Sequence, residues 1–276
     1  MAPAIVHFLV GASLLLWFAA PFVLRYETDR NELLWLVPIG GIWGLLPDVH
    51  HISPIYRAQL YAIHSSPIVD LFALHYTLDR PTIRGLYTET VFGSILLFLA
   101  AVAVVSLCSS LRERSIAAET RRERAIVTLV AFLVAAGYAG VVAGTAVSAA
   151  GELETVSALL GREGLVTAWL LLAALSLLGG LFVRSVTWAI GSTRHTRHPI
   201  AGGTIGAPIG IASWAIVGTV VAPLWIRTAG GGTVPIPYLH WPSLPAVVLF
   251  CVVFGAVYAT VRGAFDRSEK CGRPSV

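Results

Sequence analysis

The chain has 276 residues, of which 56% are hydrophobic and 12% are charged, with a formal net charge of +4 at neutral pH. Soluble domains carry about 25% charged residues, so the composition excludes an ordinary soluble domain and indicates a polytopic membrane protein. A transmembrane barrel would show alternating segments of about ten residues, which this sequence lacks, so we expect an all-α fold. The basic residues cluster in loops, as in membrane proteins, and we therefore expect no nucleic-acid partner.

Seven apolar segments predict transmembrane helices. They cover residues 4–24, 33–47, 83–111, 124–150, 164–190, 204–226 and 243–263. No basic residue precedes the first apolar stretch, so we interpret it as a retained helix and not as a signal peptide. The second would reach only about 22 Å at 1.5 Å per residue, so we expect it to be recessed in the bundle or re-entrant. Its glycines, Gly40, Gly41 and Gly44, favour close helix packing.

The segment between the second and third spans, residues 48–82, predicts two short interfacial helices. Ser53-Pro54 and Ser66-Pro67 each resemble a helix N-cap followed by proline at the first helical position. Both stretches are apolar, contain tyrosine and are too short to span a bilayer. In the later spans, glycine pairs four residues apart predict close packing within the chain; these are Gly140 with Gly144, and Gly206 with Gly210.

The loop charges predict the orientation of the chain. The loop at 112–124 is rich in arginine and the loop at 194–199 is also basic, whereas the loop at 151–164 is acidic. Because positive loops stay in the cytoplasm, we expect a multi-pass plasma-membrane protein with its N-terminus outside and its C-terminus inside. We treat the chain as one membrane domain, with a candidate metal-site half at 1–82 and a helical bundle of unassigned role at 83–276.

This orientation brings several histidines and carboxylates to the outer face. His7 opens the first span, Asp48 closes the second, and His51 follows Asp48 at a spacing of one helical turn. Imidazole nitrogen and carboxylate oxygen are zinc ligands and also suit other divalent ions. The predicted ligands of a divalent metal ion, with zinc as the candidate, are His7, Asp48, His51 and His64. We expect His50 and Glu89 to act beside them, Glu89 as a ligand or general base. The alternative is a polar rim of structural histidines at the membrane boundary.

The same residues resemble a known family. The stretches "HFLVGA" at 7–12, "GLLPDVHH" at 44–51 and "IHSS" at 63–66 resemble the membrane-bound metal-dependent hydrolases of the YdjM-like group. That family has His-x-x-x-Gly, then Leu-Pro-Asp-x-Asp-His, then His-Arg-Gly-x-Thr-His-Ser. The matching positions are His7, Gly11, Leu46, Pro47, Asp48, His51, His64 and Ser65. His50 replaces the second aspartate of the family pattern, and Gln59 replaces the first histidine of its third motif. A reassigned ligand, such as His50 or His75, would complete the site.

The resemblance implies a membrane-embedded metal-dependent hydrolase. Because the site faces the outer leaflet in the predicted orientation, we expect a membrane lipid or another amphiphile as substrate. The alternative is a non-enzymatic scaffold with a degenerate site, which would bind a membrane-protein partner or form a homo-oligomer. A third hypothesis is a sensor in which the outer histidines change protonation.

Overall fold

The computed structural model describes residues 2–113, 120–158, 164–190, 198–229 and 233–266. Within these ranges the regular elements are all helical, which confirms the all-α fold class. Seven helices are long and apolar enough to cross a membrane: Ala4–Arg25, Asn31–His51, Tyr87–Glu113, Arg121–Ala149, Leu165–Ala189, Pro199–Thr228 and Ser243–Phe265. The polytopic class predicted from the composition is therefore confirmed. Most of the basic loop at 194–199 lies outside the described residues.

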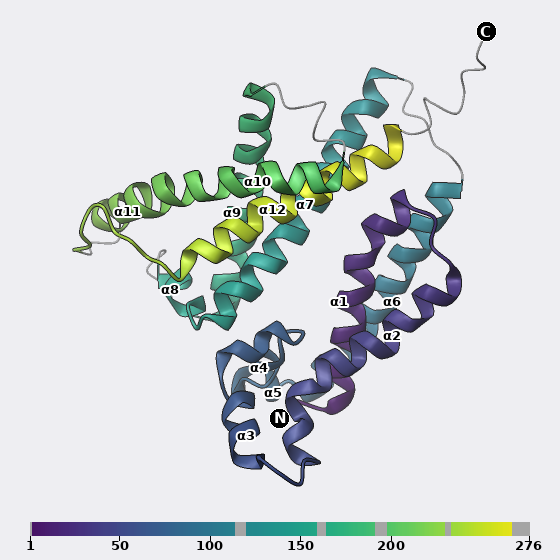
Figure 1. The fold of residues 1–276 in the computed structure, drawn as a ribbon. Helices are drawn as coiled ribbons and strands as arrows, with labels where there is room; N and C mark the ends of the chain where they lie inside the picture. The colour runs from purple at the N-terminus through teal and green to yellow at the C-terminus, as the bar shows by residue number, and fades with distance from the viewer. Residues whose placement is uncertain (1, 114–119, 159–163, 191–197, 230–232, 267–276) are drawn as a thin grey trace. The chain divides into compact units, whose positions relative to one another are not determined.

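The chain divides into two compact units, residues 1–116 and 117–276. The first contains α1 (Ala4–Arg25), α2 (Arg30–Leu45), η1 (Leu46–His51), α3 (Arg57–His64), η2 (Pro67–Leu71), α4 (His75–Leu78), α5 (Pro81–Arg84) and α6 (Tyr87–Glu113). Within this unit α1 packs along both α2 and α6 (Figure 1). The third span therefore belongs to the first unit by its contacts, whereas the sequence-based division at residue 82 grouped it with the later spans.

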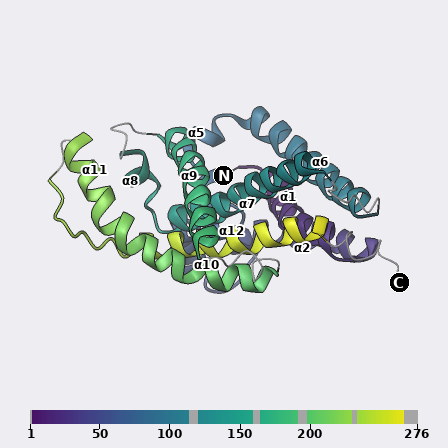
Figure 2. The same cartoon turned by 90° about the horizontal axis from the view of Figure 1, so that it is seen from above.

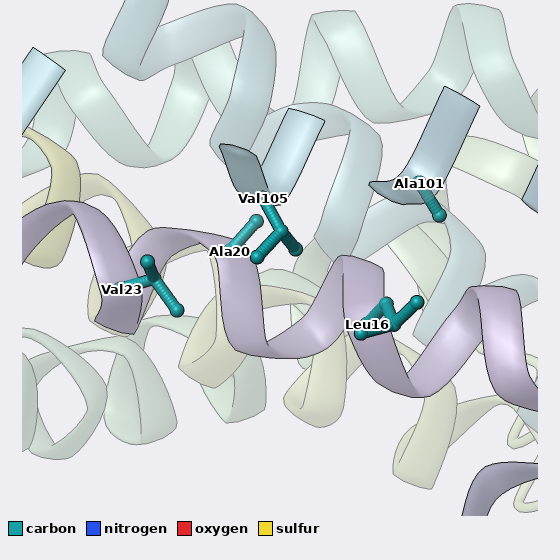
Figure 3. Packing of buried hydrophobic residues seen from close by; sticks show 5 residues of the cluster. All are labelled: Leu16, Ala20, Val23, Ala101 and Val105. Atoms are coloured by element: carbon teal, nitrogen blue, oxygen red, sulfur yellow. The ribbon is translucent and has the colours of Figure 1, made fainter. Parts of the chain in front are cut away.

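Small apolar side chains hold α1 against α6. Leu16 and Ala20 of α1 form a buried cluster with Ala101 and Val105 of α6, and Figure 3 shows these side chains together with Val23. Alanine at positions 20 and 101 keeps the two helices close, because neither residue carries atoms beyond Cβ. The packing of α1 against its neighbours in this unit fixes the position of the residues in its first turns.

Glycines allow α1 and α2 to touch through their backbones, as the sequence predicted. A Cβ atom added to Gly11 would lie 2.2 Å from the carbonyl oxygen of Gly40, and one added to Gly44 would lie 2.3 Å from the carbonyl oxygen of His7. Real Cβ atoms do not approach oxygen so closely, so only glycine fits at these positions. The contact brings the start of α1 beside the end of α2.

The second span is longer than its apolar stretch suggested. The α2 helix continues directly into the 3₁₀-helix η1, and together they give an apolar helical segment of 21 residues. The predicted short helices follow, although the second is divided. α3 is a regular helix of 8 residues, whereas Pro67–Leu71 and His75–Leu78 are separated by Ala73 and Leu74, both with positive φ.

The second unit contains α7 (Arg121–Ala149), α8 (Leu153–Ala158), α9 (Leu165–Ala189), α10 (Pro199–Ser213), η4 (Trp214–Val221), α11 (Ala222–Ala229) and α12 (Ser243–Asp266). α12 lies along both α7 and α10 (Figure 2). The predicted glycine packing is confirmed here: Gly206 faces the carbonyl oxygen of Cys251, and Gly144 faces the ring of Trp169. The sixth span contains a π-helix, η4, and the carbonyl of Thr219 in it accepts a hydrogen bond from the amide of Tyr238 at 2.9 Å.

Candidate metal centre

Three histidines and two aspartates converge beside the first turns of α1. His7 comes from α1, Asp48 from η1, His64 ends α3, His75 begins α4, and Asp79 follows α4. The Nε2 atom of His75 lies 3.3 Å from Asp48 Oδ1, and Nε2 of His64 lies 3.4 Å from Asp79 Oδ2. The Nε2 atom of His7 lies 3.5 Å from Asp79 Oδ1, and Nδ1 of His64 lies 3.7 Å from Asp48 Oδ1. The carboxylates of Asp48 and Asp79 thus link all three imidazoles.

These side chains are buried, and several of their polar atoms lack a hydrogen bond. His75 is 0% exposed, His7 is 1% exposed and His64 is 7% exposed. The buried atoms without a hydrogen-bond partner include both ring nitrogens of His7, Asp48 Oδ1, His64 Nδ1 and His75 Nε2. Native proteins leave few such atoms, because each costs about 1–3 kcal/mol. Five at one place indicate a site that is completed by a further group.

The ligand atoms are close enough to hold a metal ion. His7, Asp48 and His75 form one group in which each residue offers an atom within 4.8 Å of the others, and His64, His75 and Asp79 form another. His75 belongs to both groups. Nitrogen and carboxylate oxygen donors at such separations are typical of sites for zinc and other divalent ions. These two overlapping groups therefore fit a divalent cation by donor type and proximity, and His7, Asp48, His64 and His75 also have unsatisfied polar atoms.

Local backbone geometry directs His75 into this cluster. Ala73 and Leu74 have φ values of 56° and 62°, a left-handed conformation that non-glycine residues rarely adopt and that is associated with functional sites. His75 then begins α4, and its Nδ1 atom lies 3.0 Å from the carbonyl oxygen of Gly44. Since a carbonyl only accepts, Nδ1 carries a proton, and in the neutral ring Nε2 carries the lone pair. This arrangement prepares Nε2 of His75 as a ligand atom.

A third carboxylate, Asp70, holds α4 in place without joining the cluster. Asp70 is 0% exposed, and its two oxygens accept hydrogen bonds of 2.7 Å from the amide and the hydroxyl of Thr77. These bonds connect η2 to α4, the short helix that begins at His75 and ends just before Asp79. Asp79 in turn accepts a hydrogen bond of 2.5 Å from the amide of Ala2. Asp70 therefore braces α4, and it belongs to none of the candidate metal groups found among the described residues.

Charge interactions shift the pKa values of the groups in the segment between spans. Burial raises the pKa of the Asp79 carboxyl, but its contacts with His7 and the Ala2 amide outweigh this and lower it to about 2. Burial lowers the pKa of His75, yet the carboxylate of Asp48 and the carbonyl of Gly44 reverse the effect and leave it raised. Burial lowers the pKa of His64, and the neighbouring His75 lowers it further. At neutral pH Asp79 is therefore ionised and His64 is neutral, the forms that bind cations.

The two adjacent histidines of the "DVHH" stretch lie beside Asp48. His50 is 3% exposed, whereas His51 is exposed, and their rings lie 3.9 Å apart. Both form a third candidate group with Asp48. The Nδ1 atom of His50 lies 3.1 Å from the carbonyl oxygen of Pro47, so Nδ1 carries the proton and Nε2 is an acceptor. The His50 ring also lies 4.5 Å from that of His64, which connects this group to the main cluster.

The structure brings together three of the four predicted ligands and adds two. His7, Asp48 and His64 lie in the cluster of five, while His51 shares a group only with Asp48 and His50. Glu89 is exposed in the first turn of α6 and belongs to none of the three groups found among the described residues. Its role stays a prediction.

Sequence reasoning named His75 only as a substitute ligand and left Asp79 out. The signal that could have found them is their spacing of four residues, which places both on one face of a helix.

Comparison with known proteins found no matching protein-family model, no matching curated protein and no matching solved structure. The fold and the site therefore define the class of protein by themselves. The chain is a polytopic helical membrane protein with clustered histidines and aspartates that could hold a metal ion.

Proposed function

We propose that this protein is a membrane-embedded hydrolase that uses a divalent metal ion, with zinc as the first candidate. The observation that carries the proposal is the set of buried, unpaired ligand atoms on His7, Asp48, His64 and His75. Burial of such atoms without partners is costly, and a cation would satisfy them together. The resemblance to membrane-bound metal-dependent hydrolases rests on motifs that include His7, Asp48, His51 and His64, and it agrees with this chemistry.

Five residues would hold the ion: His7, Asp48, His64, His75 and Asp79. A divalent ion bound there would supply Lewis-acid chemistry, since it polarises a carbonyl or phosphoryl oxygen and acidifies water. The hydrogen bond from His75 Nδ1 to Gly44 fixes the tautomer and the ring orientation. The Asp70 brace keeps the second carboxylate within reach through α4.

His50 is the residue that we assign to proton transfer. Its Nδ1 proton is held by the carbonyl of Pro47, so Nε2 is free to accept a proton from water beside Asp48. The ring is nearly buried, which keeps its orientation fixed. His51 is exposed next to it and offers a route for that proton to solvent.

The substrate class that we propose is a lipid or another amphiphile. The segment around the site exposes large apolar side chains, as expected for a surface that lies in the headgroup region; these are Ile52, Ile55, Tyr56, Tyr61, Ile63 and Ile68. The loop charges predict the outer leaflet for this segment. A hydrolysable ester bond near the headgroup of a lipid would reach the site without leaving the membrane.

Elemental analysis of the purified full-length protein tests the proposal. We expect at least one divalent ion per chain in the wild type and loss of that ion in Asp48→Asn and His75→Ala. The matched control is His240→Ala, because His240 belongs to the second unit and pairs with Glu152 at 3.7 Å. Product analysis by mass spectrometry, with phospholipids and acylglycerols as substrates, should show hydrolysis that a chelator stops and zinc restores. Wild-type protein without metal, or both variants with full metal content, would refute the site; full metal content without any hydrolysis would favour the scaffold.

A further inference from the structure

Two arginines of the second unit converge on one tyrosine. The Nε atom of Arg184, in the last two turns of α9, donates a hydrogen bond of 3.1 Å to the hydroxyl of Tyr258. Arg262, near the end of α12, donates from Nη1 to the same oxygen at 3.2 Å. The guanidinium carbon of Arg184 also lies 5.7 Å from the centre of the Tyr258 ring. Two positive charges are thus held beside a single neutral oxygen atom.

No carboxylate balances these charges in the part of the chain that the structure describes. The ion pairs found there involve other residues, and none of the described side chains brings a carboxylate within ion-pair distance of Arg184 or Arg262. Tyr258 is 7% exposed and both arginines are partly buried, so water screens their mutual repulsion less than at an open surface. Two close guanidinium groups without a counter-ion favour the binding of an anion.

The N-terminus of α10 adds a third positive element at this end of the unit. α10 and α12 are antiparallel: Gly206 meets Cys251, and one turn earlier a Cβ atom added to Gly202 would lie 2.2 Å from the oxygen of Gly255. α10 begins at Pro199, with no side-chain hydrogen bond from its N-cap residue. Its first turn therefore lies level with Gly255 to Tyr258 of α12, one turn before Arg262. Free amides and the helix dipole make such an end attractive to anions.

The position of these groups indicates which anion they meet. Arg184 and Arg262 lie toward the ends of two helices that are long and apolar enough to cross a membrane, where we expect the lipid headgroups. The neighbouring loop at 194–199 is basic in sequence, which predicts the cytoplasmic side, the side of anionic lipids. The planar guanidinium fork matches the oxygens of a phosphate group in a bidentate manner. A lipid phosphodiester and free phosphate both carry such oxygens. We favour the lipid, because its acyl chains in the bilayer hold its phosphate at the level of the helix ends.

We propose that Arg184, Arg262 and the first turn of α10 bind the phosphate group of an anionic phospholipid, and that Tyr258 positions the two arginines. This site is independent of the metal centre, because all its residues belong to the second unit. Its function would be to anchor the ends of α9, α10 and α12 to the headgroup layer.

Native mass spectrometry of the full-length protein in a maltoside detergent tests this site. We expect a one-to-one adduct with phosphatidylglycerol and none with diacylglycerol, which has the chains without the phosphate. Arg184→Gln and Arg262→Gln should each weaken lipid binding about tenfold, because each removes one charge-assisted hydrogen bond to the phosphate. Tyr258→Phe keeps both charges and should weaken it about threefold. Arg121→Gln is the control, since Arg121 is exposed at the start of α7.

The result depends on folded variants and on the source of the phosphate. Circular dichroism and gel filtration identify folded variants, and Arg184→Lys and Arg262→Lys keep the charge without the fork if the glutamine variants fail to fold. Lipid binding that depends on Arg184 and Arg262 but not on Arg121 supports the proposal. A thermal shift by inorganic phosphate with the same dependence, and no added effect of phosphatidylglycerol, would overturn a lipid ligand in favour of free phosphate. Wild-type lipid binding by the Arg184→Gln/Arg262→Gln double variant would overturn the site.

Discussion

The substitution Gly11→Ala tests whether the backbone contact between α1 and α2 sets the metal centre. A Cβ atom on residue 11 would lie 2.2 Å from the oxygen of Gly40 and 3.0 Å from the nitrogen of Gly44. A relaxed non-bonded contact needs about 3.5 Å, so the helices must separate by about 1 Å. The opposing atoms belong to the backbone, and no change of rotamer relieves the contact. We therefore expect the free energy of unfolding to fall by about 1–3 kcal/mol.

The same separation should impair metal binding. His7 lies one helical turn before Gly11, and its Nε2 atom is 3.5 Å from Asp79. Ligand distances in a working metal site are kept to about 0.2 Å, so a displacement of about 1 Å at α1 removes His7 as an effective ligand. We expect the zinc affinity of Gly11→Ala to fall at least about tenfold.

Gly93→Ala is the matched control for this experiment, because Gly93 belongs to the same unit and its added Cβ atom would meet nothing within 4 Å. Zinc per chain is measured by inductively coupled plasma mass spectrometry, and the thermal midpoint by tryptophan fluorescence in one detergent. We expect Gly93→Ala to match or slightly exceed the wild type in both, since alanine favours a helix over glycine. If Gly11→Ala also matches the wild type in both measurements, the reasoning about backbone contact is refuted.

Further predictions concern the brace, the charges and the second unit. Thr77→Val removes the hydroxyl that donates to Asp70 at 2.7 Å and should cost about 1–3 kcal/mol of stability, measured by thermal unfolding. The control is Thr90→Val, which removes a hydrogen bond to the carbonyl of Tyr87 at a half-buried position; an unchanged midpoint for Thr77→Val would show that the brace is dispensable. Because the pKa of Asp79 is lowered to about 2, its carboxylate contributes about 2 kcal/mol to the stability of the metal-free protein above pH 3.8, and this contribution is lost as the pH falls toward 2. Metal-free Asp79→Asn should lack this acid-dependent loss, and equal acid sensitivity of the variant and the wild type would contradict the prediction. Because the pKa of His75 is raised, its protonated form stabilises the metal-free protein fully below pH 6.5, and this stabilisation is lost as the pH rises through the raised pKa. Zinc must displace that proton, so zinc titrations should show affinity increasing with pH, and a flat profile would exclude His75 as a ligand. Gly202→Ala should destabilise the packing of α10 on α12 while the zinc content stays at one per chain, and loss of zinc would count against a site confined to the first unit.

The membrane class, the seven spans and much of the site could be predicted from the sequence. Apolar length and low charge are properties of single segments, so they identify spans without knowledge of the fold. The glycines at 40, 41 and 44 predicted close packing because absence of a side chain has a direct steric meaning. His7, Asp48 and His64 could be grouped because each lies near the end of a predicted element on one side of the membrane.

The rest of the site depends on backbone geometry that the sequence does not reveal. His75 reaches the cluster because Ala73 and Leu74 adopt positive φ, a conformation that neither residue type predicts. Asp79 reaches the cluster because the short helix α4 places it one turn after His75, and a helix of one turn is too short to give a periodic pattern in the sequence. The length of the second span was underestimated for a similar reason: the predicted apolar stretch ends at residue 47, but the helix continues as a 3₁₀-helix to His51.

The cluster draws its ligands from four helices and the residue that follows one of them, and this origin has a mechanical consequence. α1, η1, α3 and α4 each contribute one histidine or aspartate to a small volume, so an ion bound there would cross-link segments that are far apart along the chain. Cys108 and Cys251 are both free, so the described chain has no covalent cross-link of its own at these cysteines. A bound ion would then serve the first unit as a disulfide serves a small secreted domain, by restricting the unfolded chain and by joining residues 48–79 to α1. Loss of the ion would release this segment while α1, α2 and α6 stay packed.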